Sequence, residues 1–458
     1  MQHDSHNRVN FGSKLGAILA AAGSAVGLGN IWRFPYEAGN NGGAAFIIIY
    51  LGCILLFGLP IMIAEFTIGR SSKASTGSAY EKLLPGTHWR LVGYLGVLTG
   101  FVIFGYYCVV AGWTLEYIYQ SLTLGLAGKT PEEYINMFTE FSQNPWRPIF
   151  WLFIFMLTTH FIVVKGVEKG IERSSKILMP ILFILVIVLA IGSVMLPGAE
   201  KGLEFLLKPD FSKVDSSVFL GAMGQTFYSL SLGMGCLSTY SSYFGKKAKL
   251  AHTALSVGAI DSLVAILAGI IIFPAAFSVG INPDAGPSLI FITLPNVFQQ
   301  AFGGTPILAY ICSTGFYILL ALAALTSTIS LHEVSTAFLH EKFNFTRHRA
   351  ASIVTIGCLT IGVISSLSMG EWSEYTVAGM NIFDALDYFT TKVMLPISGM
   401  SAALFVGWVL RPDIMKGEVN NYGDLGQPWY FPIYKFIIRY LAPAVIILIF
   451  INGLGLLG

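Results

Sequence analysis

The chain has 458 residues, of which 54% are hydrophobic and 11% are charged, with a formal net charge of +2. Soluble domains carry about 25% charged residues, so this chain has too few ionic side chains to cover its surface in water. The composition excludes a soluble protein and predicts contact with a lipid bilayer. The small net charge gives no indication of a nucleic-acid partner.

Long apolar segments occur along the whole chain. About 20 apolar residues cross a bilayer, and eleven segments of roughly that size or longer lie between polar or turn-rich breaks. They are residues 13–38, 42–69, 91–124, 148–165, 174–196, 217–244, 252–279, 306–339, 350–369, 377–409 and 438–457. The sequence therefore predicts an all-α polytopic membrane protein with eleven transmembrane helices.

Basic residues are distributed unevenly between the loops, and cytoplasmic loops retain Lys and Arg. With a cytoplasmic N-terminus, the inner loops carry Arg70, Lys73, Lys82, Arg90, Lys165, Lys169, Arg173, Lys176, Lys246, Lys247, Lys249, Lys342, Arg347, Arg349, Arg411 and Lys416. The outer loops hold few basic residues. We therefore expect a protein of the cell membrane with its N-terminus inside and, after eleven crossings, its C-terminus outside.

A shorter apolar stretch lies near residues 287–300. Because it is too short to span, we expect a re-entrant or capping helix on the outer face, which is a candidate lid.

Two spans contain glycine-rich interruptions where a helix former is expected. Residues 23–30 read GSAVGLGN, and residues 229–235 read SLSLGMG. Unwound backbone in a bilayer is tolerated where other groups satisfy its hydrogen bonds, and paired interruptions of this kind indicate an inverted-repeat transporter with a site at the midplane. The alternative is that the glycines only permit close helix packing.

These residues resemble a known family. GLGNIWRFP at residues 27–35, followed by NGG at 41–43, is similar to the first-span signature of the neurotransmitter:sodium symporters. The resemblance continues at residues 65–70, 106–113, 170, 180, 225–235 and 325–327. It is greatest to the bacterial amino-acid branch, specifically the eleven-span transporters of multiple hydrophobic amino acids.

The resemblance implies a leucine-transporter-like fold with ten core helices in two inverted repeats. The corresponding regions are a cytoplasmic segment with an inner-gate arginine (1–12), two five-helix repeats (13–196 and 197–409), and a cytoplasmic loop with the last span (410–458). It further implies alternating access and two Na⁺ sites. The first involves Ala25, Asn30, Ser229 and Asp261, and the second involves Gly23, Val26, Ala323, Thr326 and Ser327.

The ligands of both sites are oxygens, which suit a hard alkali cation. Taken alone, Thr326 and Ser327 more often bond back to the preceding helical turn, and Asn30 is open to an interhelical hydrogen bond instead. Asp261 aligns with, or lies beside, a sodium-ligating asparagine of the family. Since its fixed negative charge removes the need for a balancing anion, we expect chloride-independent transport. The alternative is a protonated Asp261.

Gly27 resembles the amino-acid branch, whereas monoamine transporters carry an aspartate at that position. The resemblance places the substrate against Ala25, Gly27, Leu28, Gly29, Ile103, Tyr107, Tyr228, Ser229, Ser231, Met234, Ser327, Thr328 and Leu331. The resemblance assigns the predominantly apolar side-chain pocket to Ile103, Tyr228, Ser231, Met234, Thr328 and Leu331. Met234 adapts to different shapes. We expect a sodium-coupled symporter that imports hydrophobic or aromatic L-amino acids.

The resemblance also implies two gates. Arg33 and Asp387 resemble an outer pair, and Arg8, Ser242, Tyr243 and Glu341 resemble an inner network. Gly170 and Pro180 favour local unwinding at the start of the fifth span, because glycine is permissive and proline withholds a donor.

Other function classes lack their motifs. No phosphate-binding GxxxxGK[ST] loop occurs, and no nucleophile-base or metal constellation of an enzyme lies in the spans. An amino-acid sensor or a channel-like protein without coupled transport remains the alternative.

Overall fold

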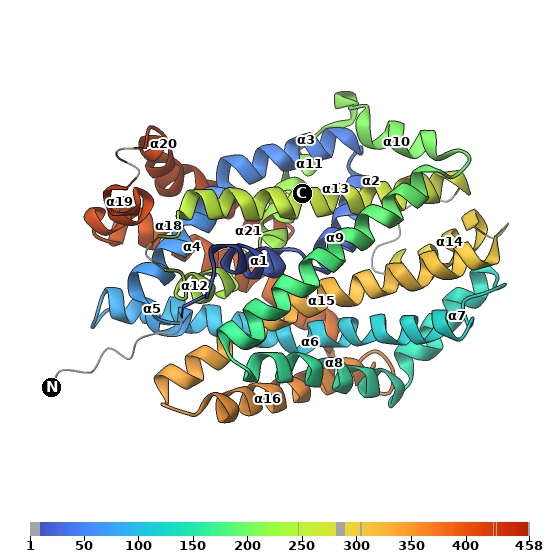
Figure 1. The fold of residues 1–458 in the computed structure, drawn as a ribbon, viewed down its shortest axis with the longest axis horizontal. Coiled ribbons are helices and arrows are strands. Elements are labelled where there is room, and N and C mark those ends of the chain that lie inside the picture. Colours follow the sequence, from blue (N-terminus) through green and yellow to red (C-terminus); the bar gives the residue numbers. More distant parts are fainter. Residues whose placement is uncertain are drawn as a thin grey trace.

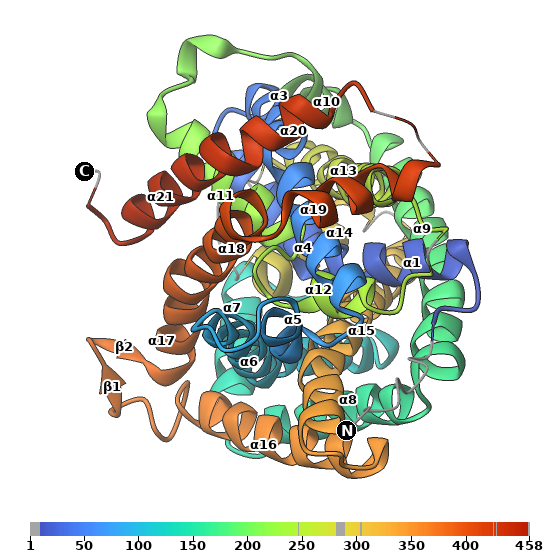
Figure 2. The same ribbon diagram turned by 90° about the vertical axis from the view of Figure 1, so that its left-hand side faces the viewer.

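The structure is a computed structural model that describes residues 10–245, 247–280, 289–302, 305–424, 426 and 428–456. Helices run side by side along the long axis of the molecule (Figure 1). Seen end on, α8 (Arg147–Val164) and α16 (Arg347–Leu367) lie along one edge, opposite α10 (Ala199–Leu207) and α20 (Phe431–Phe436) (Figure 2).

The helices before residue 200 are these: α1 (Lys14–Ala25), α2 (Phe34–Asn40), α3 (Ala44–Cys53), α4 (Leu59–Ser72), α5 (Thr76–Leu83), α6 (Arg90–Leu122), α7 (Pro131–Gln143), α8 and α9 (Arg173–Val194). π-helical turns connect or extend several of them: Gly29–Arg33, Ile54–Gly58 and Val167–Glu172.

The later helices are α10, α11 (Ser216–Ser229), α12 (Cys236–Ser241), α13 (Leu250–Ser278), α14 (Leu294–Phe302), α15 (Pro306–Lys342), α16, α17 (Ile382–Tyr388), α18 (Leu395–Leu404), α19 (Pro412–Val419), α20 and α21 (Ala442–Gly453). Their π-helical turns are Leu289–Thr293, Phe389–Met394, Phe405–Val409 and Ile437–Leu441. Short 3₁₀ turns occur at Phe211–Lys213 and Asn421–Gly423, and a hairpin pairs β1 (Thr376–Val377) with β2 (Met380–Asn381).

Within the described residues, nine continuous helices are long and apolar enough to cross a membrane, and α1 with Gly29–Asn40 forms a tenth span bent by 53°. The predicted span at 217–244 corresponds to α11 and α12, each too short to cross alone. The ten spans correspond to ten of the eleven predicted segments, and this pair of short helices occupies the remaining one.

The starts of three predicted spans differ from the structure by five residues or more, and one of them is the fifth span, which begins at Val167 rather than 174. The tenth span begins at Ile382 rather than 377, because the β1–β2 hairpin occupies the preceding residues. The last span begins at Phe431 rather than 438. Pro432 suits the first turn of a helix, and Lys435 is tolerated where that helix extends beyond the lipid.

Both predicted interruptions are present. After α1, Val26 is extended (φ −70°, ψ 106°), which ends the helix. After α11, Ser231, Gly233 and Gly235 have φ of 53°, 78° and 76°. A right-handed helix cannot pass through these left-handed residues, and a Cβ at Gly233 would lie 2.6 Å from the Leu395 carbonyl oxygen.

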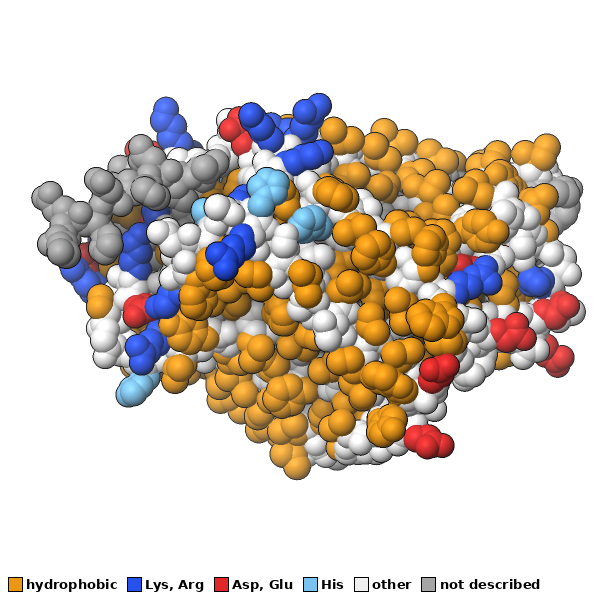
Figure 3. All heavy atoms as spheres, turned by 90° about the horizontal axis from the view of Figure 1, so that it is seen from below, with side chains coloured by type: hydrophobic (Ala, Val, Ile, Leu, Met, Phe, Trp, Pro, Cys, Tyr) orange, Lys and Arg blue, Asp and Glu red, His pale blue; other side chains and the backbone are white. Residues whose placement is uncertain are grey.

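The face drawn in Figure 3 has an apolar middle and two polar ends. In Figure 3, hydrophobic side chains cover the middle of this face, Lys and Arg gather at one end, and acidic side chains lie mainly toward the other. We call the first the basic end; α4 and α15 finish there, and α16 begins there (Figure 1). An apolar belt between charged ends fits a protein surrounded by lipid.

Candidate functional site

The two interruptions face one another inside the bundle. Ser231 donates a hydrogen bond to the Ser24 carbonyl oxygen at 2.8 Å, and the Gln225 amide donates to the Gly29 carbonyl oxygen at 3.2 Å. Side chains of α11 and the segment after it therefore satisfy backbone oxygens around the first interruption. This is the compensation that unwound backbone in a bilayer requires.

Glu65 of α4 supports the second interruption. Its carboxylate accepts a hydrogen bond from the Gly233 amide at 2.7 Å, and the residue is 2% exposed. Glu65 was not among the predicted site residues. The sequence signal for such a role was an ionisable residue inside the apolar segment 42–69, because ionisable residues are rare in spans unless they have a partner.

A narrow cavity of about 30 Å³ lies between the interruptions. Its lining consists of Ser24, Ala25, Gly27, Gly29, Ile103, Tyr107, Tyr228, Ser229, Ser231, Met234, Cys236, Ser327 and Leu331. All of the predicted substrate residues except Leu28 and Thr328 are among them. Ser24 and Cys236 line the cavity without having been predicted.

Leu28 and Thr328 are oriented differently. The Leu28 amide donates a hydrogen bond to the Tyr107 hydroxyl at 3.2 Å, so its backbone touches a cavity residue. The Thr328 hydroxyl lies 3.0 Å from that of Thr159 in α8. Successive helical residues point about 100° apart. Ser327 faces the cavity, and Thr328 consequently faces α8.

Gly27 is in close contact with two cavity side chains. A Cβ at this position would lie 2.5 Å from the Ser327 hydroxyl oxygen and 3.2 Å from the Tyr107 hydroxyl oxygen. At Gly29, a Cβ would lie 2.9 Å from the Tyr228 ring. The interruption therefore packs so tightly against α6, α11 and α15 that no side chain fits at Gly27.

Asp261 of α13 is at the centre of a buried polar cluster. Its carboxylate lies 2.7 Å from the Asn30 amide nitrogen, 2.9 Å from the Ser229 hydroxyl and 3.0 Å from the Tyr50 hydroxyl, each of which donates to it. Asp261, Asn30 and Tyr50 are 0% exposed. Tyr50 was missed by the sequence analysis; a hydroxyl within an otherwise apolar segment was its only signal.

The oxygens predicted for the second cation site also lie together. The Thr326 hydroxyl is 2.9 Å from the Ala323 carbonyl oxygen and 3.3 Å from that of Val26, and the Ser327 hydroxyl is 3.4 Å from the latter. A Cβ at Gly23 would lie 3.2 Å from the Thr326 Cβ. The Thr326 hydroxyl therefore bonds back to its own helix and also contacts the first interruption.

Both clusters present oxygen atoms, which suit a hard monovalent cation rather than a transition metal. The described part of the chain contains no group of three or more His, Cys, Asp and Glu side chains arranged to hold a metal ion.

The predicted outer-gate residues have other partners. The Arg33 Nε lies 3.7 Å from a Glu37 carboxylate oxygen, and its guanidinium carbon lies 4.7 Å from the centre of the Tyr228 ring. Asp387 accepts a hydrogen bond from Tyr106 at 3.1 Å. Although both residues are described, Arg33 and Asp387 form no ion pair with each other.

A second cavity, of about 230 Å³, adjoins Tyr228. Arg33, Glu37 and Lys392 contribute charges to its lining, and Asn452 of α21 lies on another side. Lys392 is therefore a cavity residue rather than a lipid-facing one, which is consistent with a charge inside a span.

Tyr243 belongs to a polar network toward the basic end. Its hydroxyl donates to the Glu333 carboxylate at 2.6 Å, and Arg347 pairs with the same carboxylate at 2.5 Å. Glu333 and Arg347 were not predicted. Glu333 lies inside the apolar segment 306–339, where a carboxylate requires a partner.

The remaining inner-gate residues make separate contacts. The Glu341 carboxylate accepts a hydrogen bond from the Ser75 amide at 2.8 Å, and the Ser242 hydroxyl donates to the Thr239 carbonyl within the same helical turn. Arg8 lies outside the described residues.

The N-terminal segment is attached to the start of the fifth span. Glu172, at the end of the Val167–Glu172 π-helical turn that contains Gly170, accepts hydrogen bonds from the Gly12 amide at 2.6 Å and the Ser13 hydroxyl at 2.8 Å. Pro180 lies inside α9. The stretch predicted to unwind is helical here, from the Val167–Glu172 turn into α9, and it contacts the segment that precedes α1.

The interrupted helices, the enclosed cavity and the adjacent oxygen clusters together define a membrane transporter of small molecules. The model of the Sodium:neurotransmitter symporter family matches residues 8–140 and 138–456. The chain belongs to this family: it is a sodium-dependent symporter embedded in a membrane, and it is not an enzyme.

Three proteins illustrate the family relationship. The sodium-dependent transporter YhdH of Bacillus subtilis (strain 168) is 36% identical over 450 residues, covering 98% of each chain. The human sodium- and chloride-dependent GABA transporter 2 is 26% identical, covering 96% of this chain and 78% of its own. The crystal structure of MhsT in complex with L-phenylalanine has a TM-score of 0.88 and 45% identity, covering 98% and 100%.

The MhsT likeness spans nearly the whole chain, and the interruptions at the predicted places agree with it. The chain therefore has the all-α, leucine-transporter-like fold.

Proposed function

We propose that this symporter imports hydrophobic and aromatic L-amino acids with Na⁺ and does not require chloride. The cavity between the interrupted helices carries the proposal. Ile103, Met234 and Leu331 supply its apolar surface. The close packing at Gly27 leaves no space for the protein to carry a charged side chain at that position. The MhsT complex with L-phenylalanine adds support for an aromatic substrate, since that relative covers almost the whole chain.

The substrate carboxylate belongs near the first interruption. Tyr107 offers a hydroxyl there, which in turn accepts a hydrogen bond from the Leu28 amide at 3.2 Å. The amide of Gly29 is close by at the start of the Gly29–Arg33 turn. Amides at the beginning of a half-helix attract anions, so this end of the cavity suits a carboxylate and the apolar part suits the side chain.

Two Na⁺ ions travel with the substrate. The first takes ligands from Ala25, Asn30, Ser229 and Asp261, beside the substrate carboxylate. The second takes ligands from the residues at Gly23, Val26 and Ala323 and from the hydroxyls of Thr326 and Ser327. The second set joins α1 to α15, so Na⁺ there stabilises the contact between these helices.

Asp261 balances the cation charge. Its carboxylate is buried and hydrogen-bonded to Asn30 and Ser229. As a fixed anion beside the first Na⁺, it performs the role that a bound chloride would otherwise perform, because an unpaired charge is costly in a low-dielectric interior.

The basic end faces the cytoplasm under the positive-inside rule, which places the N-terminus inside and the C-terminus outside the cell. Alternating access then requires Arg33 to leave Glu37 and approach Asp387 when the outer path closes. The network of Tyr243 and Glu333 closes the inner path, together with Glu341. Residues 289–300, the described part of the predicted lid, lie on the outer side.

Uptake of radiolabelled L-phenylalanine into proteoliposomes tests the function. We expect accumulation with an inward Na⁺ gradient, none with K⁺, and unchanged uptake when gluconate replaces chloride. Leucine and tryptophan are expected to compete, and glycine is not. Sodium-dependent binding without accumulation or counterflow would contradict symport and indicate a sensor. A requirement for chloride would contradict only the charge-balance role of Asp261.

A further inference from the structure

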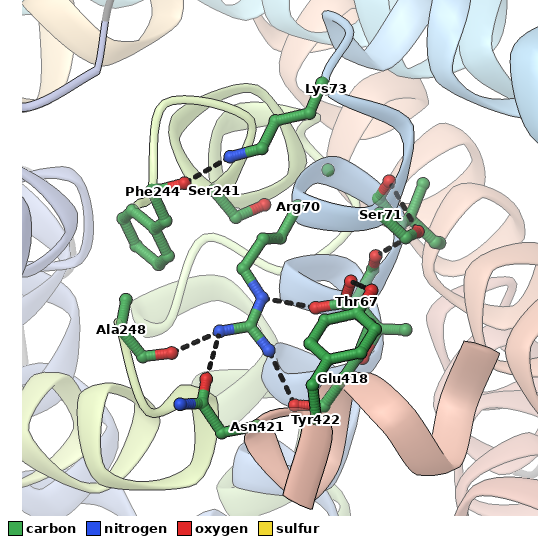
Figure 4. A network of polar contacts seen from close by, with 12 residues as sticks. Thr67, Arg70, Ser71, Lys73, Ser241, Phe244, Ala248, Glu418, Asn421 and Tyr422 are labelled. Carbon is green, nitrogen blue, oxygen red and sulfur yellow. Dashed lines mark hydrogen bonds and ion pairs between the residues drawn. The ribbon is translucent and has the colours of Figure 1, made fainter. Parts of the chain in front are cut away.

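Arg70, at the end of α4, is the centre of a buried polar cluster at the basic end (Figure 4). Its Nε and one terminal nitrogen bond to the side chain and the carbonyl oxygen of Glu418, the latter at 2.6 Å. The other terminal nitrogen bonds to the Ala248 carbonyl and, at 3.1 Å, to the Asn421 side chain. The side chains of Arg70 and Glu418 are each 2% exposed.

The cluster joins three distant parts of the chain. Arg70 ends the second span, Ala248 lies in the connection between α12 and α13, and Glu418 and Asn421 lie in or just after α19. The planar guanidinium offers five N–H groups in a fixed arrangement. One side chain therefore holds all three segments, and lysine does not reproduce these contacts.

Tyr422 completes the shell around Glu418. Its hydroxyl donates to the second carboxylate oxygen at 2.6 Å. Partial desolvation of the hydroxyl, together with the bond to this carboxylate, raises the pKa of Tyr422 to about 12, although the side chain as a whole is 66% exposed. The hydroxyl therefore keeps its proton at neutral pH, and both oxygens of Glu418 have hydrogen-bond donors.

The backbone that carries these partners is strained. Asn421 and Tyr422 are consecutive non-glycine residues with φ of 54° and 55°. Left-handed residues of this kind cost about 1–3 kcal/mol each and persist where surrounding contacts hold them. Here both side chains bond into the Arg70 cluster, and these contacts compensate the strain.

The same end of α4 supports the inner gate. Lys73 donates to the Phe244 carbonyl, and the preceding residue, Tyr243, accepts the Phe11 amide at 3.1 Å. The Phe11 ring packs against Tyr243 and Phe244 with ring centres 5.9 and 6.2 Å apart. The N-terminal segment therefore rests on residues that follow α12, and α4 holds those residues from the other side.

We propose that Arg70 and Glu418 are positioning residues for the inner gate. They hold the α12–α13 connection where Tyr243 and Phe244 receive the N-terminal segment, and thereby favour the state closed to the cytoplasm. This inference rests on the proposed alternating access. Weakening the cluster shifts the population toward the inward-open state, because fewer contacts are then lost on opening.

Cys236 provides the test, because it lines the central cavity and becomes accessible from the cytoplasm only when the inner path opens. The reporter is its labelling rate by a membrane-impermeant maleimide on the cytoplasmic side of proteoliposomes in Na⁺. We expect R70K to label about tenfold faster than wild type, equivalent to about 1.4 kcal/mol toward opening. Thermal stability in detergent shows whether the variant is folded.

The double variant R70M/E418M separates two effects: loss of the contacts that join the three segments, and exposure of the fold to a buried, unpaired charge. Replacing a buried ion pair by apolar residues is often neutral for stability, yet it removes the bonds to Ala248 and Asn421. We expect this variant to remain folded and to label about as fast as R70K. R411M is the matched control, since Arg411 pairs with Asp413 on the same segment and is 76% exposed; its rate should equal that of wild type.

The other four cysteines are buried too. Loss of labelling in C236S therefore shows that the maleimide reacts with Cys236. The positioning role would be overturned if folded R70K and R70M/E418M were labelled by the maleimide at the wild-type rate. The proposed function is tested separately by wild type: its labelling should be slower in Na⁺ than in K⁺, with uptake as described above. If wild type responds to Na⁺ and the variants behave like it, only the positioning role fails.

Discussion

The side-chain amide of Asn30 lies 2.7 Å from the carboxylate of Asp261, although 231 positions separate the two residues in the chain. This contact joins the first interruption to α13. It places a fixed negative charge beside the residues proposed to hold the first Na⁺.

Asp261→Asn tests that charge. The substitution keeps the side-chain shape and removes the anion, so we expect uptake to become dependent on chloride, falling about tenfold when gluconate replaces it. Asp413→Asn, at an exposed position, is the control. Equal uptake by Asp261→Asn in chloride and gluconate would remove the charge-balance argument.

Gly27→Ala tests the close packing at the interruption. Its Cβ would meet the Ser327 hydroxyl oxygen at 2.5 Å, so we expect a loss of substrate affinity of at least about tenfold, measured by Na⁺-dependent binding. Gly52→Ala in α3 is the control, because a Cβ there has no neighbour within 4 Å. Wild-type binding by Gly27→Ala would show that the backbone at this site adapts.

Tyr107→Phe tests the carboxylate position. It removes the hydroxyl and leaves the Leu28 amide without this acceptor, which costs about 1–3 kcal/mol. We expect the KM for L-phenylalanine to rise about 10- to 100-fold. Tyr119→Phe, 48% exposed on the same helix, should behave as wild type. An unchanged KM in Tyr107→Phe would place the carboxylate elsewhere.

Thr326→Val tests the second Na⁺ position. The threonine hydroxyl lies 3.3 Å from the Val26 carbonyl oxygen, and its loss should raise the half-saturating Na⁺ concentration about tenfold. Thr360→Val is the matched control, because Thr360 makes only a back-bond to Ile356 at 3.0 Å and is exposed. The same response in both variants would mean that back-bonding alone explains Thr326.

Much of the architecture was predictable from the chain. Apolar length located the spans, and the glycines at 23–30 and 229–235 located both interruptions, because backbone freedom is a local property. The family resemblance then identified most of the cavity lining. Thr328 was expected there too, but it faces α8. Several consecutive residues of this helical stretch are polar, so the sequence does not show which of them faces the cavity.

Partners far apart in the chain required the fold. Tyr50 and Glu333 look like isolated polar residues in apolar segments, and Glu418 looks like an ordinary loop carboxylate. Their hydrogen-bond partners come from other helices: Asp261 for Tyr50, Arg347 for Glu333, and Arg70 for Glu418.

The amino-acid sequence by itself determined that this protein is embedded in a lipid bilayer and where its helices are interrupted. Hydropathy and backbone preference act within a few neighbouring residues, so no packing information was needed. Tertiary structure alone decided which buried charges and hydroxyls meet. Arg70 and Glu418, 348 positions apart, are an example, because pairing depends on helix rotation and packing, to which distant segments contribute together.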